Sequence, residues 1–136
     1  MIRMKGETTK GVMQLFFYGI SGETRPKGWG LANFTIPDAG IFFRARFKGN
    51  QEECEYAALL ALLEFVEINP QLFKNRTVEV YGDSFTVVHQ VNQKMLCGKT
   101  LEPYRNMALL YKKKFDYSLS WIPKNENPAT VGGDRA

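Results

Sequence analysis

The sequence predicts an α/β protein built on a five-stranded mixed sheet with helices on both faces. Strand-like runs rich in β-branched and aromatic residues occupy the first third of the chain. Helical periodicity then dominates residues 51–68, and a short apolar run at 76–81 follows that helix. A strand that is reached through a helix can pair in parallel with the first strand, and this would make the sheet mixed.

The first three elements are expected to form an antiparallel meander. Turns rich in Gly and Pro separate them, and apolar and charged residues alternate along the third, which predicts one face in water. The three predicted strands cover residues 13–18, 28–36 and 41–48.

The remaining elements follow from helical spacing and from residues that begin or end helices. Asn50 suits an N-cap for the helix over 51–68, and Asn69-Pro70 ends it. The strand at 76–81 follows, and the order expected for the whole chain is β-β-β-α-β-α-α-β-α. The later predicted elements are a helix from Asp83 to about Gln93, a helix over 101–114, a strand over 117–122 and a C-terminal helix.

Size and composition bound the class of protein. A chain of 136 residues that is 44% hydrophobic and 24% charged suits one globular domain, expected over 13–136 after a disordered segment at 1–12. No apolar run is long enough to cross a bilayer, and the first residues lack the apolar centre of a signal peptide. We therefore expect a cytoplasmic protein with Cys54 and Cys97 as reduced thiols.

The net charge of +4 is unevenly distributed. The segment 94–114 contains six basic residues and one acid, so it carries about +5 and the rest of the chain is close to neutral. A basic face of this kind suits a polyanionic partner, and it also suits a solvated helix surface without a ligand.

Two acids are placed to share a divalent cation. Asp83 directly follows the predicted strand at 76–81, and Glu55 lies in the first turns of the long helix. Ligands in mixed α/β sheets bind outside the carboxyl ends of strands where the strand order reverses, which here means Tyr18-Gly19 and Gly82-Asp83. Each acid also has a purely structural interpretation: Asp83 as a helix N-cap, and Glu55 as an exposed acid near a helix start.

Four blocks of sequence, in this order, resemble the ribonuclease H fold, in particular the ribonuclease HI-like and reverse-transcriptase-like branch. The short stretch between Gln93 and Leu101 is similar to the subclass without a basic protrusion. The blocks are FFYGISGETRPKGWG, NQEECEYAALLALLEF, VEVYGDSFTVVHQVNQ and WIPKNENPATVGGDRA.

The resemblance implies an activity and a set of metal ligands. Members of this family use four acids to hold two Mg²⁺ or Mn²⁺ ions and cleave the RNA strand of RNA–DNA hybrids. Glu55, Asp83 and Asp134 match three of these catalytic, metal-binding acids, although the spacing before Asp134 is longer than usual. Tyr18 stands where the first aspartate is expected, and a neutral phenol is a poor magnesium ligand.

Two hypotheses follow from this mismatch. The first is a catalytically degenerate ribonuclease H-like protein that binds RNA–DNA hybrid or RNA weakly, or serves as an interaction module for a protein partner. The second is an active metal-dependent ribonuclease H with a rearranged metal site, in which Glu23 or Asp134 converges on Glu55 and Asp83. Residues expected to contact nucleic acid are Arg25, Lys27, Lys99, Arg105, Lys112, Lys113, Lys114 and Lys124.

The remaining aromatic and imidazole side chains receive structural interpretations. Trp29 and Trp121 are expected in the core rather than in a base-stacking surface. His89, the only histidine, is expected to have no catalytic role.

Overall fold

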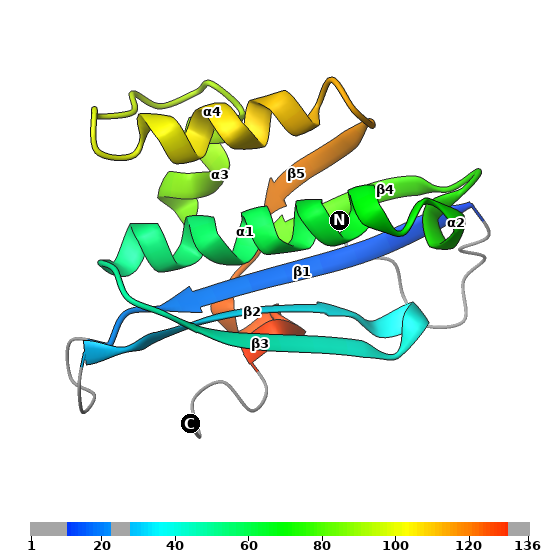
Figure 1. Cartoon of the computed structure of the whole chain (residues 1–136), viewed down its shortest axis with the longest axis horizontal. Coiled ribbons are helices and arrows are strands. Elements are labelled where there is room, and N and C mark those ends of the chain that lie inside the picture. Colours follow the sequence, from blue (N-terminus) through cyan, green and yellow to red (C-terminus); the bar gives the residue numbers. More distant parts are fainter. Residues whose placement is uncertain (1–10, 23–27, 131–136) are drawn as a thin grey trace.

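The computed structural model describes residues 11–22 and 28–130, which form a five-stranded mixed sheet with the order β3-β2-β1-β4-β5 (Figure 1). The central strand pairs antiparallel with β2 and parallel with β4, so the meander and the parallel crossover predicted from the sequence are both confirmed. The strands are β1 (Val12–Ile20), β2 (Gly30–Ile36), β3 (Ile41–Phe47), β4 (Thr77–Gly82) and β5 (Tyr117–Trp121).

One face of the sheet is covered by α-helices (Figure 1). Helix α1 (Gln51–Ile68) packs on β1 and β2, and it begins at Asn50 with a capping box in which Asn50 and Glu53 each accept a backbone N–H from the other. Two shorter helices, α3 (Phe85–Val91) and α4 (Glu102–Tyr111), complete this layer and share the main apolar core with α1. A further short helix, α2 (Pro70–Phe73), follows α1 and was not expected.

The opposite face carries a smaller apolar cluster that the C-terminal segment closes. Phe16, Tyr18 and Tyr81 of the sheet pack there with Ile122 and Ala129. The segment forms two 3-10 turns, η3 (Lys124–Glu126) and η4 (Pro128–Thr130), rather than an α-helix as far as residue 130. A third 3-10 turn, η2 (Pro37–Ala39), connects β2 to β3.

Two buried asparagines hold the C-terminal segment against the sheet. The Asn127 side chain donates to the Phe17 carbonyl at 2.9 Å, and the Asn33 side chain donates to the Ala129 carbonyl at 3.1 Å. Because both amides are buried, these bonds satisfy groups that would otherwise be costly to remove from water. The segment after β5 is therefore fixed over the carboxyl end of β1.

Two differences from the expected elements are local. Strand β1 starts at Val12, inside the segment expected to be disordered, while residues 1–10 lie outside the described residues. Helix α3 starts at Phe85 and not at Asp83, because the Ser84 side chain is the N-cap and accepts the Val87 N–H at 3.1 Å. Asp83 is thereby left outside the helix, between β4 and the cap.

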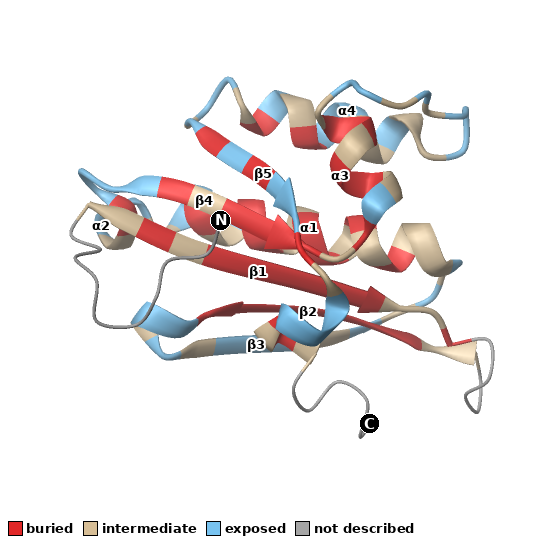
Figure 2. Ribbon diagram, turned by 180° about the vertical axis from the view of Figure 1, so that it is seen from behind, coloured by how far each residue is buried: buried red, intermediate tan, exposed pale blue. Residues whose placement is uncertain are grey.

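Burial falls off toward the margin formed by β3 (Figure 2). Strands β1 and β2 are almost wholly buried, whereas Phe42 and Phe43 of β3 are exposed. Among the described residues no helix is long and apolar enough to cross a membrane.

Candidate functional site

Glu55 and Asp83 both line a pocket of about 250 Å³ at the carboxyl ends of β1 and β4, here called the acid pocket. The last parallel pair of these strands joins Phe17 to Gly82, so Tyr18 is the next residue of β1 and Asp83 is the first residue after β4. The sequence prediction that these strand ends meet is thus confirmed. The lining residues are Tyr18, Gly19, Ile20, Gln51, Glu55, Asp83 and Lys124.

The position of Glu55 depends on the close approach of α1 to β1. A Cβ atom added at Gly19 would lie 2.5 Å from the backbone of Cys54 and Glu55, so only glycine permits this contact. The Gln51 side chain bridges the same elements: its amide nitrogen donates to the Gly19 carbonyl at 2.9 Å and to Glu55 Oε2 at 2.8 Å. The first turn of α1 therefore directs Glu55 toward the strand ends.

The other oxygen of Glu55 is tied to the residue after Asp83. Ser84 Oγ donates to Glu55 Oε1 at 2.7 Å. Burial raises the pKa of the Glu55 carboxyl above its ordinary value, the bonds from Gln51 and Ser84 oppose that shift, and the nearby charge of Asp83 adds to it. The charge of Asp83 thus reaches the Glu55 carboxyl, although burial is the main cause of the raised pKa of Glu55.

Asp83 has one carboxylate oxygen without a partner. Its Oδ2 atom is buried and accepts no hydrogen bond in the described part of the protein. Burial raises the pKa of Asp83, while the Asn127 side chain and the charge of Lys124 pull the pKa back down. A buried carboxylate oxygen without a donor is expensive to keep ionised, so this atom is suited to meet a cation.

Tyr18 and Lys124 occupy the remaining side of the acid pocket. The Tyr18 ring is buried, and Lys124 Nζ lies 5.6 Å from the ring centroid, within the range of a cation–π contact. Lys124 also acts on the charge of Asp83, as its effect on the pKa of that acid indicates. A side-chain ammonium and a neutral ring therefore supply part of the environment of the acids.

This donor set fits a single divalent cation better than a pair. Mg²⁺ prefers several oxygen ligands and retains waters, and Glu55 with the unpartnered oxygen of Asp83 provides two carboxylates. Within residues 11–22 and 28–130, however, no group of three Asp, Glu, His or Cys side chains could hold a metal ion. Asp134, the third expected metal ligand, and Glu23 lie outside the described residues.

The cations expected to contact nucleic acid are spread over both ends of the sheet. Lys99 lies in the loop before α4, and Arg105 lies in the first turns of that helix. This part of α4 is close to the start of α1, because Tyr104 of α4 stacks on Tyr56 of α1 with ring centroids 5.8 Å apart. Arg25 and Lys27 lie outside the described residues. Two cations that were not singled out, Arg46 and Lys48, lie over the Trp29 ring at the acid-pocket end of β3.

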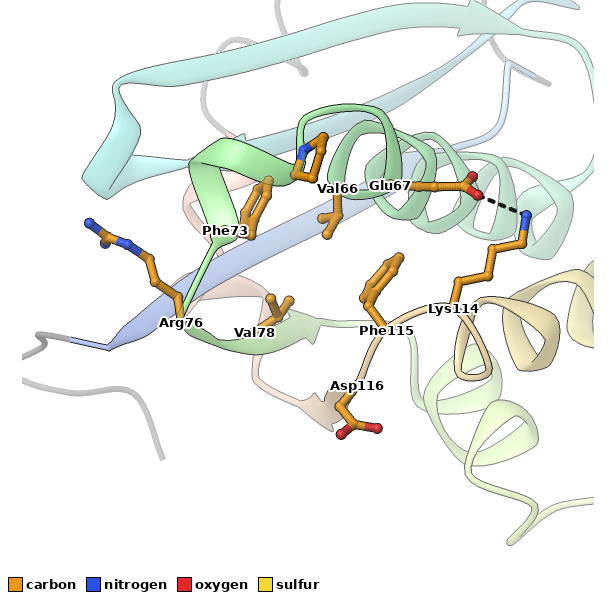
Figure 3. Close-up of a pocket in the computed structure, with 9 residues that line it drawn as sticks. Val66, Glu67, Phe73, Arg76, Val78, Lys114, Phe115 and Asp116 are labelled. Carbon is orange, nitrogen blue, oxygen red and sulfur yellow. Dashed lines mark hydrogen bonds and ion pairs between the residues drawn. The ribbon is translucent and has the colours of Figure 1, made fainter.

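The lysine run at 112–114 lies at the opposite end of the sheet. A pocket of about 390 Å³ opens there beside the first residue pairs of β4 and β5 (Figure 3). Figure 3 shows Lys114 directed at Glu67 of α1, to which it forms an ion pair at 2.9 Å. Lys112 donates to the Tyr117 carbonyl at 2.7 Å, and burial lowers its pKa. Lys113 lines a separate surface depression beside α4.

Sequence reasoning missed residues that act through long-range contacts. Gln51 and Ser84 position the acids, and Asn127 fixes the C-terminal segment, but their partners are remote in the sequence. Trp121 was expected in the core, and the structure corrects this: 44% of its surface is exposed, since β5 is the edge strand on that side.

Comparison with known proteins identifies solved structures that share this architecture. The chain matches no protein-family model and no curated protein sequence. Its structure is similar to that of RNase H1 from the halophilic archaeon Halobacterium salinarum NRC-1, with a TM-score of 0.74 and 23% identity over 93% of this chain and 100% of that one. The chain has a ribonuclease H-like fold. The resemblance inferred from the four sequence blocks is thus confirmed for the fold.

Two further structures share the ribonuclease H-like fold. LC11-RNase H1, isolated from compost by a metagenomic approach, has a TM-score of 0.75 and 19% identity over 92% of this chain and 91% of that one. The same enzyme solved in complex with an RNA/DNA hybrid has a TM-score of 0.74 and 18% identity, over 90% of this chain and 97% of that one.

Proposed function

We propose that this chain is a ribonuclease H-like protein that binds RNA–DNA hybrid, or a related nucleic acid, and has lost metal-dependent cleavage. The observation that carries the proposal is the buried Tyr18 ring at the end of β1, beside Asp83 and under the Lys124 ammonium. At this position the resemblance implies an aspartate that touches both catalytic metal ions. An uncharged ring with a neighbouring ammonium disfavours the binding of two further cations.

The energetic consequence for cleavage is large. A two-metal site stabilises both the attacking and the leaving oxygen, so the loss of its bridging ligand removes several kcal/mol of transition-state stabilisation. Each ~1.4 kcal/mol lost lowers the rate about tenfold. Glu55 and Asp83 remain suitable for one Mg²⁺ or Mn²⁺ ion, which would help bind phosphate and would leave the second role unfilled.

Binding of nucleic acid is supported by the charge distribution and by a structural neighbour. The chain has a net charge of +4, and Lys48, Lys124 and Arg105 lie toward the end of the sheet that carries the acid pocket. LC11-RNase H1, which shares the fold, was solved with an RNA/DNA hybrid. Since such contacts release counterions, affinity should fall as salt concentration rises.

The decisive experiment combines cleavage and binding on one substrate. A labelled RNA–DNA hybrid is incubated with the protein in Mg²⁺ or Mn²⁺ and analysed on a denaturing gel, and its binding is measured by fluorescence anisotropy at several salt concentrations. We expect no cleavage and a salt-dependent affinity. Cleavage that disappears in Asp83→Asn would contradict the loss of activity, and affinity that ignores salt would point to a protein partner.

An active ribonuclease with a rearranged metal site is the second candidate. It is favoured by the unpartnered, buried Oδ2 atom of Asp83, which a metal ion would satisfy. The missing ligand would then come from Glu23 or Asp134. This candidate predicts hybrid cleavage that Glu23→Gln or Asp134→Asn abolishes, whereas the proposed function predicts no cleavage to abolish.

A further inference from the structure

Exposed aromatic side chains gather close to Asp83, one of the residues that line the acid pocket. Phe85, the first residue of α3, is 55% exposed, and Trp121, the last residue of β5, is 44% exposed. His89 lies one turn after Phe85 on α3. We call Phe85, His89 and Trp121 the aromatic rim.

The three rings contact one another in a fixed arrangement. The His89 ring stacks on Phe85 with centroids 3.9 Å apart and an interplanar angle of 29°, and its Nδ1 atom lies 2.8 Å from the Phe85 carbonyl oxygen. Trp121 meets Phe85 edge to face, with centroids 6.5 Å apart and an angle of 75°. Rings with few rotatable bonds that already hold one another lose little entropy when a ligand binds.

The aromatic rim is joined directly to the acid pocket. Trp121 Nε1 donates to the Asp83 carbonyl at 3.2 Å, and Phe85 follows Asp83 by two residues. Lys124, three residues after Trp121, lines the acid pocket. A nucleic acid strand that entered the acid pocket past Asp83 would therefore meet these rings, with Lys124 close by for its phosphates.

The size of the aromatic rim distinguishes between occupants. A large aromatic side chain buries 150–250 Å² when fully covered, so two half-exposed rings offer only about 200 Å² in all. Stable protein interfaces need about 1,000 Å² or more, which makes this surface too small to hold a protein by itself. It matches the area of one or two nucleobases, and aromatic side chains are the usual platforms for unpaired bases.

We propose that Phe85 and Trp121 form a stacking platform for an unpaired nucleobase of a strand that enters the acid pocket. The inference rests on the proposed function, because it requires nucleic acid at that pocket. It adds a preference: the protein binds a hybrid with a single-stranded extension more tightly than a blunt hybrid of the same sequence. Bases in a continuous duplex are stacked on their neighbours and cannot stack on protein rings.

The test compares two labelled probes by fluorescence anisotropy: a blunt RNA–DNA hybrid and the same hybrid with a short single-stranded extension, placed at either end. Stacking of one base changes affinity roughly 5- to 150-fold. We expect a preference for one extended probe within this range, abolished by Phe85→Ala and retained in Phe85→Tyr. Phe43→Ala removes another exposed phenylalanine, on β3 and away from the acid pocket, and should leave the preference unchanged.

The outcomes separate this inference from the proposed function. If neither probe binds at low salt, the proposed function fails and this inference fails with it. If both probes bind equally, or if Phe85→Ala keeps the preference, the stacking platform alone is wrong. Circular dichroism and thermal melts of each variant confirm that a lost preference is not a lost fold.

Fluorescence provides an independent readout of the stacking. The chain has two tryptophans, so Trp29→Phe leaves Trp121 as the only one. Stacking of a base on Trp121 should quench its emission on addition of the preferred extended probe, and the blunt probe should quench it less. Equal quenching by both probes would overturn the proposed platform.

Discussion

At the scale of single residues, the Tyr18 ring determines how much negative charge the acid pocket carries. The ring occupies the end of β1 beside Asp83, and Lys124 lies over it. Two carboxylates then share the pocket with one ammonium, so its ionised side chains carry a net charge of about −1. A third carboxylate at this position would raise the negative charge to about −2, an excess that a bound cation or a proton would relieve.

Replacement of Tyr18 by aspartate should therefore create a response to metal. In metal-free buffer that contains a chelator, Tyr18→Asp is expected to lower the free energy of unfolding by about 3 kcal/mol or more, because it deletes a buried ring and adds a buried charge. Addition of Mn²⁺ should recover part of this loss, seen as a rise in the melting temperature. Tyr18→Asn makes a similar cavity without the charge, and an equal Mn²⁺ response in this control would argue against the electrostatic interpretation.

Asp83 gives a prediction about pH. Burial raises its pKa, so between the ordinary value of about 4 and the raised value the folded protein binds more protons than the unfolded chain. The contribution of Asp83 to the free energy of unfolding is therefore largest below the ordinary pKa, and it falls as pH rises through the raised pKa. Asp83→Asn should raise the melting temperature at pH 7, and the gain should shrink toward pH 4.

The control for this measurement is an exposed carboxylate. Asp38 lies in the η2 turn and is exposed, so Asp38→Asn should change the melting temperature little. A stability gain in Asp83→Asn that persists unchanged at pH 4 would mean that the ionised carboxylate is not its source.

At the scale of elements, the contact between α1 and β1 places Glu55 in the acid pocket. The helix itself could be predicted to the residue from 51 to 68, because its capping box and its Asn-Pro ending are local signals. The distance between α1 and β1 could not be predicted, because it depends on the close contact of Gly19 with the backbone of Cys54, 35 positions later in the sequence.

Gly19→Ala tests this contact. The added Cβ would lie 2.5 Å from backbone atoms of Cys54 and Glu55, so α1 must shift away from β1 and Glu55 must move with it. We expect a loss of about 1–3 kcal/mol in the free energy of unfolding, measured by urea denaturation. Gly98→Ala is the matched control, since nothing lies within 4 Å of its Cβ position, and a similar loss there would remove the argument.

A long-range contact and a local ambiguity explain two other differences between sequence and structure at this scale. The Asn127–Phe17 hydrogen bond joins residues 110 positions apart, and no local pattern announces it. The start of α3 was misplaced because Asp83 and Ser84 are both good N-caps, and only the structure shows that Ser84 is chosen. The positions of Glu55 and Asp83 were predictable because strand ends and helix starts converge in this class of sheet.

At the scale of the whole molecule, the two ends of the sheet differ in what their cations do. At the acid-pocket end, Lys124 lies within the pocket itself, whereas at the opposite end Lys114 is neutralised by Glu67 (Figure 3). The sequence contains one basic segment, and the fold divides it between the two ends of the sheet. Lys99 lies before α4 and Arg105 lies in its first turn, whereas the lysine run at 112–114 follows the helix.

This division predicts different salt dependence for two lysine variants. If hybrid binds at the acid pocket, Lys124→Ala should weaken affinity and reduce the slope of log affinity against log salt by about 1. Lys114→Ala should change neither quantity appreciably. Anisotropy titrations at three or more salt concentrations measure both, and the reverse pattern would place the nucleic acid on the lysine run.

Strand β3 has a consequence for how copies of the protein behave toward one another. As the margin of the sheet, its backbone offers a ready template for a further strand, and its exposed Phe42 and Phe43 would favour such pairing. Arg44 and Arg46 follow them on the same strand, and the repulsion between like charges opposes the pairing of two β3 edges. These arginines therefore protect the exposed edge, and replacement of both by neutral residues should cause the protein to aggregate by pairing of β3 strands from different copies.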